Sequence, residues 1–94
     1  MPFTYILECA DGTLYTGWAE DLDRRVQAHN VGRGARYTRG RRPVRLVYWE
    51  KHYSRSVAQQ REAALRRLSR AQKQQLIHAF GGDNDEPFGG VACL

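Results

Sequence analysis

Cysteine is scarce in this chain of 94 residues, which contains only Cys9 and Cys93. Two cysteines so far apart form neither a C-x-x-C pair nor a cluster of metal ligands, which excludes a disulfide framework and a zinc cage. Long apolar runs are also missing, and the start Met-Pro-Phe-Thr-Tyr has no basic segment before an apolar stretch. We therefore expect a soluble, cytoplasmic protein that does not use a membrane.

Acidic side chains are few and unevenly distributed. The chain has ten of them against fifteen basic ones, which gives a net charge of +5. Residues 83–94 hold three of the acids and no Lys or Arg, so the basic excess of residues 1–82 is larger still. The length suits one domain, and 41% hydrophobic residues argue against wholesale disorder. We predict a single domain over residues 1–82 and an acidic, mobile tail over residues 83–94.

Arginine is abundant in one short segment, where six of these residues fall between Arg33 and Arg45. Such a density favours a phosphate-rich partner, because neutralised phosphates release their counterions. A solvated basic surface is the plain alternative, and an anionic membrane fits poorly because no amphipathic helix carries these arginines. We predict that this segment binds DNA, or RNA, and that Tyr37 could stack on a base. The predicted nucleic-acid contacts are Arg33, Arg36, Tyr37, Thr38, Arg39, Arg41 and Arg42.

The order of strand and helix signals predicts an α+β domain. Residues 3–9 and 13–17 are strand-like and flank the turn signal Asp11-Gly12, which indicates a hairpin that could bring Tyr5 and Tyr15 to one face. A helix over residues 19–30 follows, then a loop over residues 32–43 and a third strand over residues 44–49.

Two more helices are predicted after the third strand. The first opens at a capping box, Ser56-x-x-Gln59, and has one apolar face. The second opens at Ser69-x-x-Gln72 and ends at Gly81-Gly82. The apolar face of the first helix comprises Val57, Ala64, Leu65 and Leu68, and that of the second comprises Leu76, Ile77 and Phe80.

Several single residues have ordinary explanations when each is taken alone. A tyrosine in a strand is usually a packing residue, and Arg25 and Glu62 could form helix ion pairs with Asp21 and Arg66. Their joint order is more specific. It comprises Tyr5, Tyr15-Thr16-Gly17, Leu22-x-x-Arg25-x-x-x-His29, Gly34-Ala35-x-Tyr37-Thr38-Arg39-Gly40 and a helical Glu62.

These five motifs, taken in order from about Phe3 to Phe80, resemble the GIY-YIG nuclease superfamily. More specifically, they resemble its small stand-alone bacterial branch of excision-repair-type domains. The resemblance implies a small three-stranded antiparallel sheet flanked by helices in the order ββαβαα, as the element pattern predicts. Three positions depart from the family's pattern: Phe3-Thr4 replaces Gly-Ile, Thr16 replaces Ile, and Trp18 stands where a lysine is frequent.

The resemblance implies hydrolysis of a phosphodiester with one divalent metal, Mg²⁺ or Mn²⁺. Tyr15 would be the general base, Glu62 the only protein ligand of the metal, and Gly17 a structural glycine of the motif. Arg25 suits stabilisation of phosphate charge, and Tyr5 would position the water or a phosphate oxygen. The role of His29 stays open between orienting Tyr15, sharing its proton and protonating the leaving oxygen.

Three functions are therefore compared. The first is a metal-dependent DNA endonuclease that selects single-stranded or branched structures and works in repair or processing. The second is a catalytically weak nucleic-acid-binding module, for DNA or RNA. The third is a docking protein for a larger repair complex. In the last case the tail after Gly82 would be needed for the association.

Overall fold

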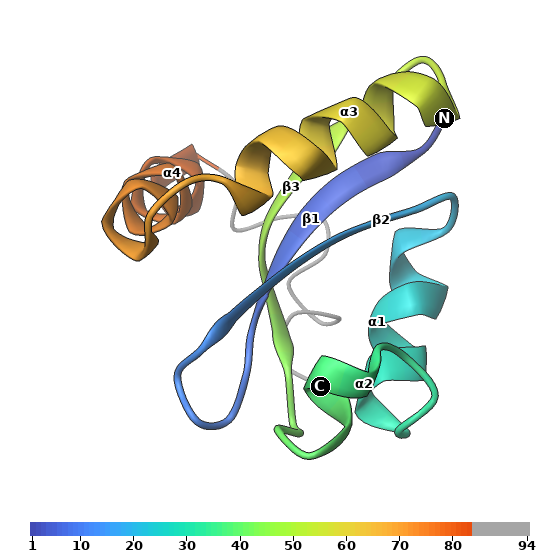
Figure 1. Cartoon of the computed structure of the whole chain (residues 1–94), viewed down its shortest axis with the longest axis vertical. Coiled ribbons are helices and arrows are strands. Elements are labelled where there is room, and N and C mark those ends of the chain that lie inside the picture. Colours follow the sequence, from blue (N-terminus) through green and yellow to red (C-terminus); the bar gives the residue numbers. More distant parts are fainter. Residues whose placement is uncertain (84–94) are drawn as a thin grey trace.

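The computed structural model describes residues 1–83. It contains a three-stranded antiparallel sheet with helices on both faces, as Figure 1 shows. The sheet has the strand order β2-β1-β3, so the first strand lies in the centre. The elements are β1 (Phe3–Glu8), β2 (Leu14–Ala19), α1 (Leu22–Asn30), α2 (Arg36–Arg39), β3 (Arg45–Lys51), α3 (Arg55–Arg66) and α4 (Arg70–Asp83). The predicted α+β class and the order ββαβαα are confirmed, and the four-residue α2 is an addition within the predicted loop.

The predicted hairpin is present and is closed by local bonds. The Asp11 carboxylate accepts from the amide and the hydroxyl of Thr13, and Gly12 has a φ of 84°, which glycine adopts readily. In the resulting register Tyr5 lies opposite Gly17, and Leu7 opposite Tyr15. Because side chains alternate along a strand, Tyr5 and Tyr15 lie on the same face of the sheet.

Helix α1 begins later than predicted. Residues 19–30 were expected to be helical, but Ala19 pairs with Phe3 at the end of β2 and is buried there. Asp21 is the N-cap, since its side chain accepts from the amide of Arg24 at 3.1 Å. The first helical residue is Leu22, which is buried in the main core, formed by Tyr5, Leu7, Cys9, Ala19, Leu22, Val26, Val44 and Leu46.

Helix α3 covers the other face of the sheet. Its N-cap is Ser54, which accepts from the amide of Val57, so the predicted box at Ser56 was wrong. The predicted apolar face was also partly wrong: Val57 and Ala64 are exposed, whereas Ala58 and Leu65 are fully buried. The small side chain of Ala58 lets the helix come close enough for its carbonyl to accept from the Thr4 hydroxyl at 2.9 Å.

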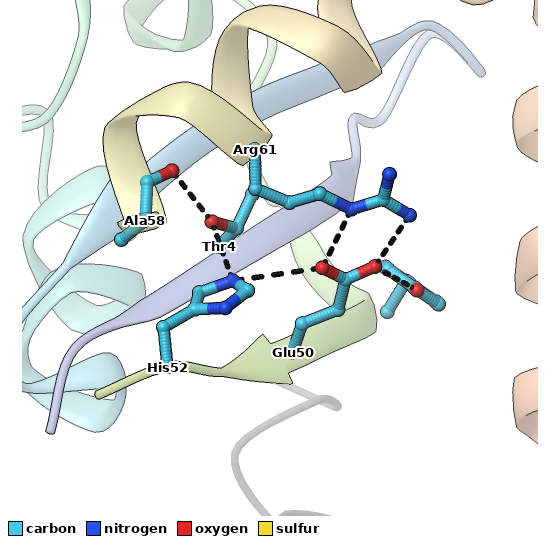
Figure 2. A network of polar contacts seen from close by, with 6 residues as sticks. Thr4, Glu50, His52, Ala58 and Arg61 are labelled. Carbon is cyan, nitrogen blue, oxygen red and sulfur yellow. Dashed lines mark hydrogen bonds and ion pairs between the residues drawn. The ribbon is translucent and has the colours of Figure 1, made fainter. Parts of the chain in front are cut away.

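A polar network joins α3 to the sheet on this face (Figure 2). Arg61 donates twice to the Glu50 carboxylate, at 2.7 and 2.9 Å, and Tyr48 donates to the same group. His52 Nε2 lies 3.1 Å from the Thr4 hydroxyl and 3.5 Å from Glu50. Burial raises the pKa of the Glu50 carboxyl, but the bonds from Arg61 and Tyr48 outweigh it and leave that pKa below its ordinary value.

Helix α4 opens as predicted and continues further. Ser69 and Gln72 form the reciprocal capping box: the Ser69 amide donates to the Gln72 side chain, and the Gln72 amide donates to the Ser69 hydroxyl. The predicted stop at Gly81-Gly82 was wrong, because the helix runs to Asp83. Phe80 packs edge-on against Trp49 at 4.4 Å between ring centres, which fixes α4 against β3. From residue 84 onwards, the predicted tail lies outside the described residues.

No helix within residues 1–83 is long and apolar enough to cross a membrane.

Candidate active site

Tyr5, Tyr15 and His29 meet on the α1 face of the sheet. The Tyr5 hydroxyl lies 2.9 Å from His29 Nε2, and both residues are buried, with exposures of 1% and 0%. Tyr15 is only half-buried, and its ring packs edge-on against the imidazole, with 5.2 Å between centres. The hairpin and α1 therefore bring together three of the predicted residues, and of these Tyr15 is the one open to solvent.

The hydrogen bonds of His29 fix the position of its proton. Thr38 donates its hydroxyl proton to the carbonyl of Ala35 at 3.0 Å, so its oxygen must accept from His29 Nδ1 at 2.7 Å. With the proton on Nδ1, Nε2 accepts from the hydroxyl of Tyr5. The amide of Ala35 lies 3.4 Å from Nδ1, which is too long to compete with the 2.7 Å bond. Both ring nitrogens are thus occupied.

The pKa values of Tyr5 and His29 agree with a bond in which the Tyr5 hydroxyl donates to His29 Nε2. Burial, reinforced by the positive charge of Arg25, lowers the pKa of His29 to about 4, so the imidazole is neutral near pH 7. Burial also raises the pKa of Tyr5 to about 12, although a bond to Arg25 opposes the rise. Tyr5 therefore keeps its proton, and its hydroxyl is a donor to a neutral histidine.

Two glycines leave the room that this pair needs. A Cβ at Gly17 would lie 2.6 Å from the Tyr5 hydroxyl oxygen, and one at Gly34 would lie 2.3 Å from His29 Nδ1. Real Cβ atoms do not approach other atoms so closely, so a side chain at either position would displace the ring. The predicted structural role of Gly17 has this close contact as its physical cause.

Arg25 and Glu62 complete the set around Tyr5. Arg25 lies half-buried one helical turn before His29, and its charge acts on both Tyr5 and His29. Glu62 comes from α3 and is near enough to Tyr5 for its negative charge to raise the pKa of the phenol. It also forms the ion pair with Arg66 that ordinary helix spacing allows, at 3.1 Å.

Glu62 is the carboxylate that could hold a metal here. Within residues 1–83 no group of three or more His, Cys, Asp and Glu gathers, which does not suit zinc. Mg²⁺ and Mn²⁺ accept one or two carboxylates together with water and phosphate oxygens. The Glu62 side chain is 19% exposed, and only its Oε2 is bound, by Arg66, among the described residues. The site fits Mg²⁺ or Mn²⁺ with Glu62 as the single protein ligand.

The arginine-rich segment divides into bound and free side chains. Arg41 pairs with Asp11 at 3.0 Å and lies over the ring of Tyr37, and Arg42 donates to the carbonyl of Arg39. These two arginines therefore stabilise the fold of the loop and also add positive charge to it. The guanidinium groups of three others make no bond with another described residue and are exposed: those of Arg33, Arg36 and Arg39.

Two other predicted nucleic-acid contacts lie close to the active site. Thr38 is fully buried, which leaves it no surface for a nucleic acid, and it holds His29 instead. Tyr37 is 39% exposed and stacks on Tyr15, with 5.8 Å between ring centres. The segment thus supplies part of the site's framework, which its arginine content did not indicate.

Comparison with known proteins agrees with this geometry. The profile of the GIY-YIG catalytic domain matches residues 1–75 of the chain. The chain therefore belongs to the GIY-YIG family of nuclease domains, which implies that it binds nucleic acid.

Within that family the chain is similar to the UPF0213 proteins. The UPF0213 protein of Clostridium perfringens is 53% identical over 77 residues, which cover 82% of this chain and 83% of the relative. That of Natronomonas pharaonis is 52% identical over 75 residues, covering 80% and 88%. The solution NMR structure of the UPF0213 protein of Bacillus halodurans has 46% identity and a TM-score of 0.56, and the match covers 88% of this chain and 89% of that one.

The sequence did not single out Arg66 or Lys73. Arg66 was considered only as a helix partner of Glu62, yet it also lies 3.4 Å from the carbonyl of Thr16 on β2. Lys73 follows the Ser69 capping box by one turn and is half-buried beside β2 and α2, where it lines a hollow with Tyr15. The available signal was a lysine in the first turn of a helix that opens at a capping box, since the helix dipole disfavours a cation there.

Proposed function

We propose that this protein is a divalent-metal-dependent endonuclease that hydrolyses phosphodiester bonds in DNA. Its substrates would be single-stranded or branched structures, and its setting DNA repair or processing. The observation that carries the proposal is the gathering of Tyr15, His29, Arg25 and Glu62 around Tyr5. The exposed Arg36 and Arg39 flank Tyr37 in the sequence, and the ring of Tyr37 stacks on that of Tyr15.

Tyr15 is the residue that takes the proton from the attacking water. It is half-buried and open to solvent. Tyr5 is covered, and because burial raises its pKa to about 12, it keeps its proton. Positive charge from Arg25 and from a bound metal would favour the phenolate that accepts the proton. Tyr5 is too covered to touch the water or a phosphate oxygen itself, and its hydroxyl would instead position Arg25, to which it is bonded.

His29 is a positioning residue in this scheme. It is fully buried, and its two nitrogens are bound to Tyr5 and Thr38, so it does not reach a leaving oxygen. Its function is to hold the Tyr5 hydroxyl in one direction. Of the three roles considered for it, the buried position of His29 and its bond to Tyr5 support orientation, here of the Tyr5 hydroxyl.

Arg25 stabilises the extra negative charge on the phosphate as water adds, because its guanidinium is charged at every relevant pH. Glu62 would hold Mg²⁺ or Mn²⁺, which would supply further charge at the same phosphate when bound. The ion pair with Arg66 at 3.1 Å holds the carboxylate in one direction.

The exposed guanidinium groups of Arg33, Arg36 and Arg39 support a DNA backbone as the partner. Contacts with phosphates give affinity and register but carry no sequence information. A surface of such contacts supports recognition of DNA by its structure and not by its base sequence.

The proposal is tested with labelled single-stranded, duplex and branched DNA, each with Mg²⁺, Mn²⁺ or EDTA. We expect metal-dependent cleavage that Glu62→Gln abolishes while DNA binding persists, because this change removes the carboxylate charge and keeps the shape. Cleavage of one DNA structure above the others would define the substrate. Binding without cutting by wild type and variant alike would overturn the nuclease and favour the nucleic-acid-binding module.

A further inference from the structure

A hollow adjoins the proposed active site at Tyr15. It has a volume of about 310 Å³ and lies between β2, α2, α3 and α4. Of the proposed catalytic set, only Tyr15 lines it. The complete lining is Leu14, Tyr15, Thr16, Tyr37, Arg66 and Lys73.

Two cations from different helices converge on this hollow. Arg66 is held toward β2 by Glu62 at 3.1 Å and by the carbonyl of Thr16 at 3.4 Å. Lys73 comes from α4 and is half-buried. Burial, together with the positive charge of Arg66, lowers the pKa of the Lys73 ammonium.

Like charges at one site are costly unless an anion joins them. Among the residues that line the hollow there is no Asp or Glu, and the single carboxylate of Glu62 is shared with the proposed metal. The other lining groups include the ring of Tyr37, which stacks on Tyr15. Two cations, an aromatic wall and an open volume of this size suit a phosphate with its attached sugar.

The place of the hollow defines which phosphate it would take. Arg25 and Glu62, which would act on the cleaved phosphate, do not line it. Tyr15 lines the hollow and belongs to the proposed catalytic set, and Arg66 is paired with Glu62 at 3.1 Å, so the two sites adjoin and would take neighbouring phosphates of one strand.

We propose that Arg66 and Lys73 bind the backbone phosphate next to the one that is cleaved, with its sugar against Tyr37. This inference rests on the proposed nuclease function, which it deepens by naming a subsite for the flanking nucleotide. Lys73 is a substrate-binding residue in this account and does not take part in the proton transfer.

The first test compares Lys73→Gln and Lys73→Arg with wild type. The chain has only one other lysine, Lys51, which is exposed at the end of β3, so Lys51→Gln is the matched control. We expect Lys73→Gln to weaken binding of a short single-stranded oligonucleotide several-fold. The slope of log K against log salt should fall by about 0.7, the value for one lost phosphate contact on a single strand.

In cleavage assays the same variant should raise KM with little change in kcat, because Lys73 binds the flanking phosphate and not the reacting one. Lys73→Arg should recover most of the affinity, and Lys51→Gln should behave like wild type. A Lys73→Gln protein that is folded and binds and cuts as wild type overturns the subsite. If Tyr15→Phe still abolishes cutting, that result leaves the nuclease standing.

The second test needs no variant. Reductive methylation with ¹³C-formaldehyde labels only Lys51, Lys73 and the terminal amine, and it preserves their charge. In EDTA, where cutting is blocked, the oligonucleotide should shift the Lys73 signal and leave the Lys51 signal in place. A Lys73 signal that stays fixed while amides of residues 33–39 shift would contradict the subsite. A Lys73 shift without any metal-dependent cleavage would retain the binding site but reject the nuclease.

Discussion

At the scale of single residues, Thr16 and Thr4 differ in how their buried hydroxyl groups are satisfied. Both lie on the α3 face of the sheet. The Thr4 hydroxyl donates to Ala58 and contacts His52, whereas that of Thr16 is the one buried side-chain polar atom without a partner among the described residues. Thr16 stands where the family pattern has isoleucine, so this position carries a polar group that packing does not need.

Thr16→Val should therefore stabilise the protein by about 1 kcal/mol, because it replaces an unpaired hydroxyl with a methyl group of similar size. Urea unfolding followed by circular dichroism measures the change. Thr4→Val is the matched control, and we expect it to destabilise by about 1–2 kcal/mol, since it removes the buried bond that joins the Thr4 hydroxyl of β1 to the Ala58 carbonyl of α3. Equal losses at both positions would show that the Thr16 hydroxyl has a partner after all.

Gly34→Ala should displace His29, because the added Cβ would lie 2.3 Å from Nδ1. We expect a loss of about 1–3 kcal/mol from overpacking and a change in the NMR signals of the Tyr5–His29 pair. Gly40→Ala provides the control, since a Cβ there meets nothing within 4 Å. A Gly34→Ala protein as stable as Gly40→Ala, with unchanged His29 signals, would refute the close contact.

At the scale of elements, some turns and helix ends are set by residues close in sequence, and others are set by contacts between distant parts of the chain. The Ser69 box and the Asp11-Gly12 turn are formed by residues a few positions apart, and the sequence predicted both. The start of α1 and the cap of α3 were misplaced, because the first depends on Ala19 pairing with β1 and the second on where α3 meets Thr4. Chain-local signals carry no information about such contacts.

The caps make a direct prediction for α3. Ser54→Ala should destabilise the protein by about 1 kcal/mol, the usual cost of a lost N-cap, and Ser56→Ala should be close to neutral. Thermal unfolding of the two variants beside wild type measures the difference. The reverse order would place the cap at Ser56, as the sequence pattern alone indicated.

The site was predictable to a similar extent. Hairpin register and helix spacing bring four residues together, and the order of their motifs along the chain was enough to predict this. They are Tyr5, Tyr15, Arg25 and His29. The bond from His29 to Thr38 depends on how the arginine-rich loop folds back on α1, and no spacing rule describes that loop. For the same reason, the convergence of Arg66 and Lys73 from two helices became evident only in three dimensions.

At the scale of the whole molecule, stability should depend on pH through His29. The unfolded chain takes up a proton on this residue near pH 6.5, whereas the folded protein keeps it neutral down to about pH 4. The unfolded state therefore binds more protons in this window, and stability falls as pH falls through it. Between pH 7 and pH 5 the loss should be roughly 2 kcal/mol, at about 1.4 kcal/mol for each pH unit below 6.5.

Urea unfolding at a series of pH values from 7 to 5 measures this loss. His29→Gln should be less stable than wild type at pH 7 but should show a shallower slope, because the titrating group is gone. A variant slope parallel to that of wild type would assign the pH dependence to other groups.

The central claim is that Tyr15 is the base of a metal-dependent phosphodiester hydrolysis. The most direct measurement is the single-turnover rate of DNA cleavage in Mg²⁺ for wild type, Tyr15→Phe and Tyr53→Phe, where Tyr53 is 91% exposed and far from the motif in sequence. The account predicts a loss of about 10²- to 10⁴-fold for Tyr15→Phe, with DNA affinity retained and Tyr53→Phe unaffected. A Tyr15→Phe protein that cuts at the wild-type rate would contradict it.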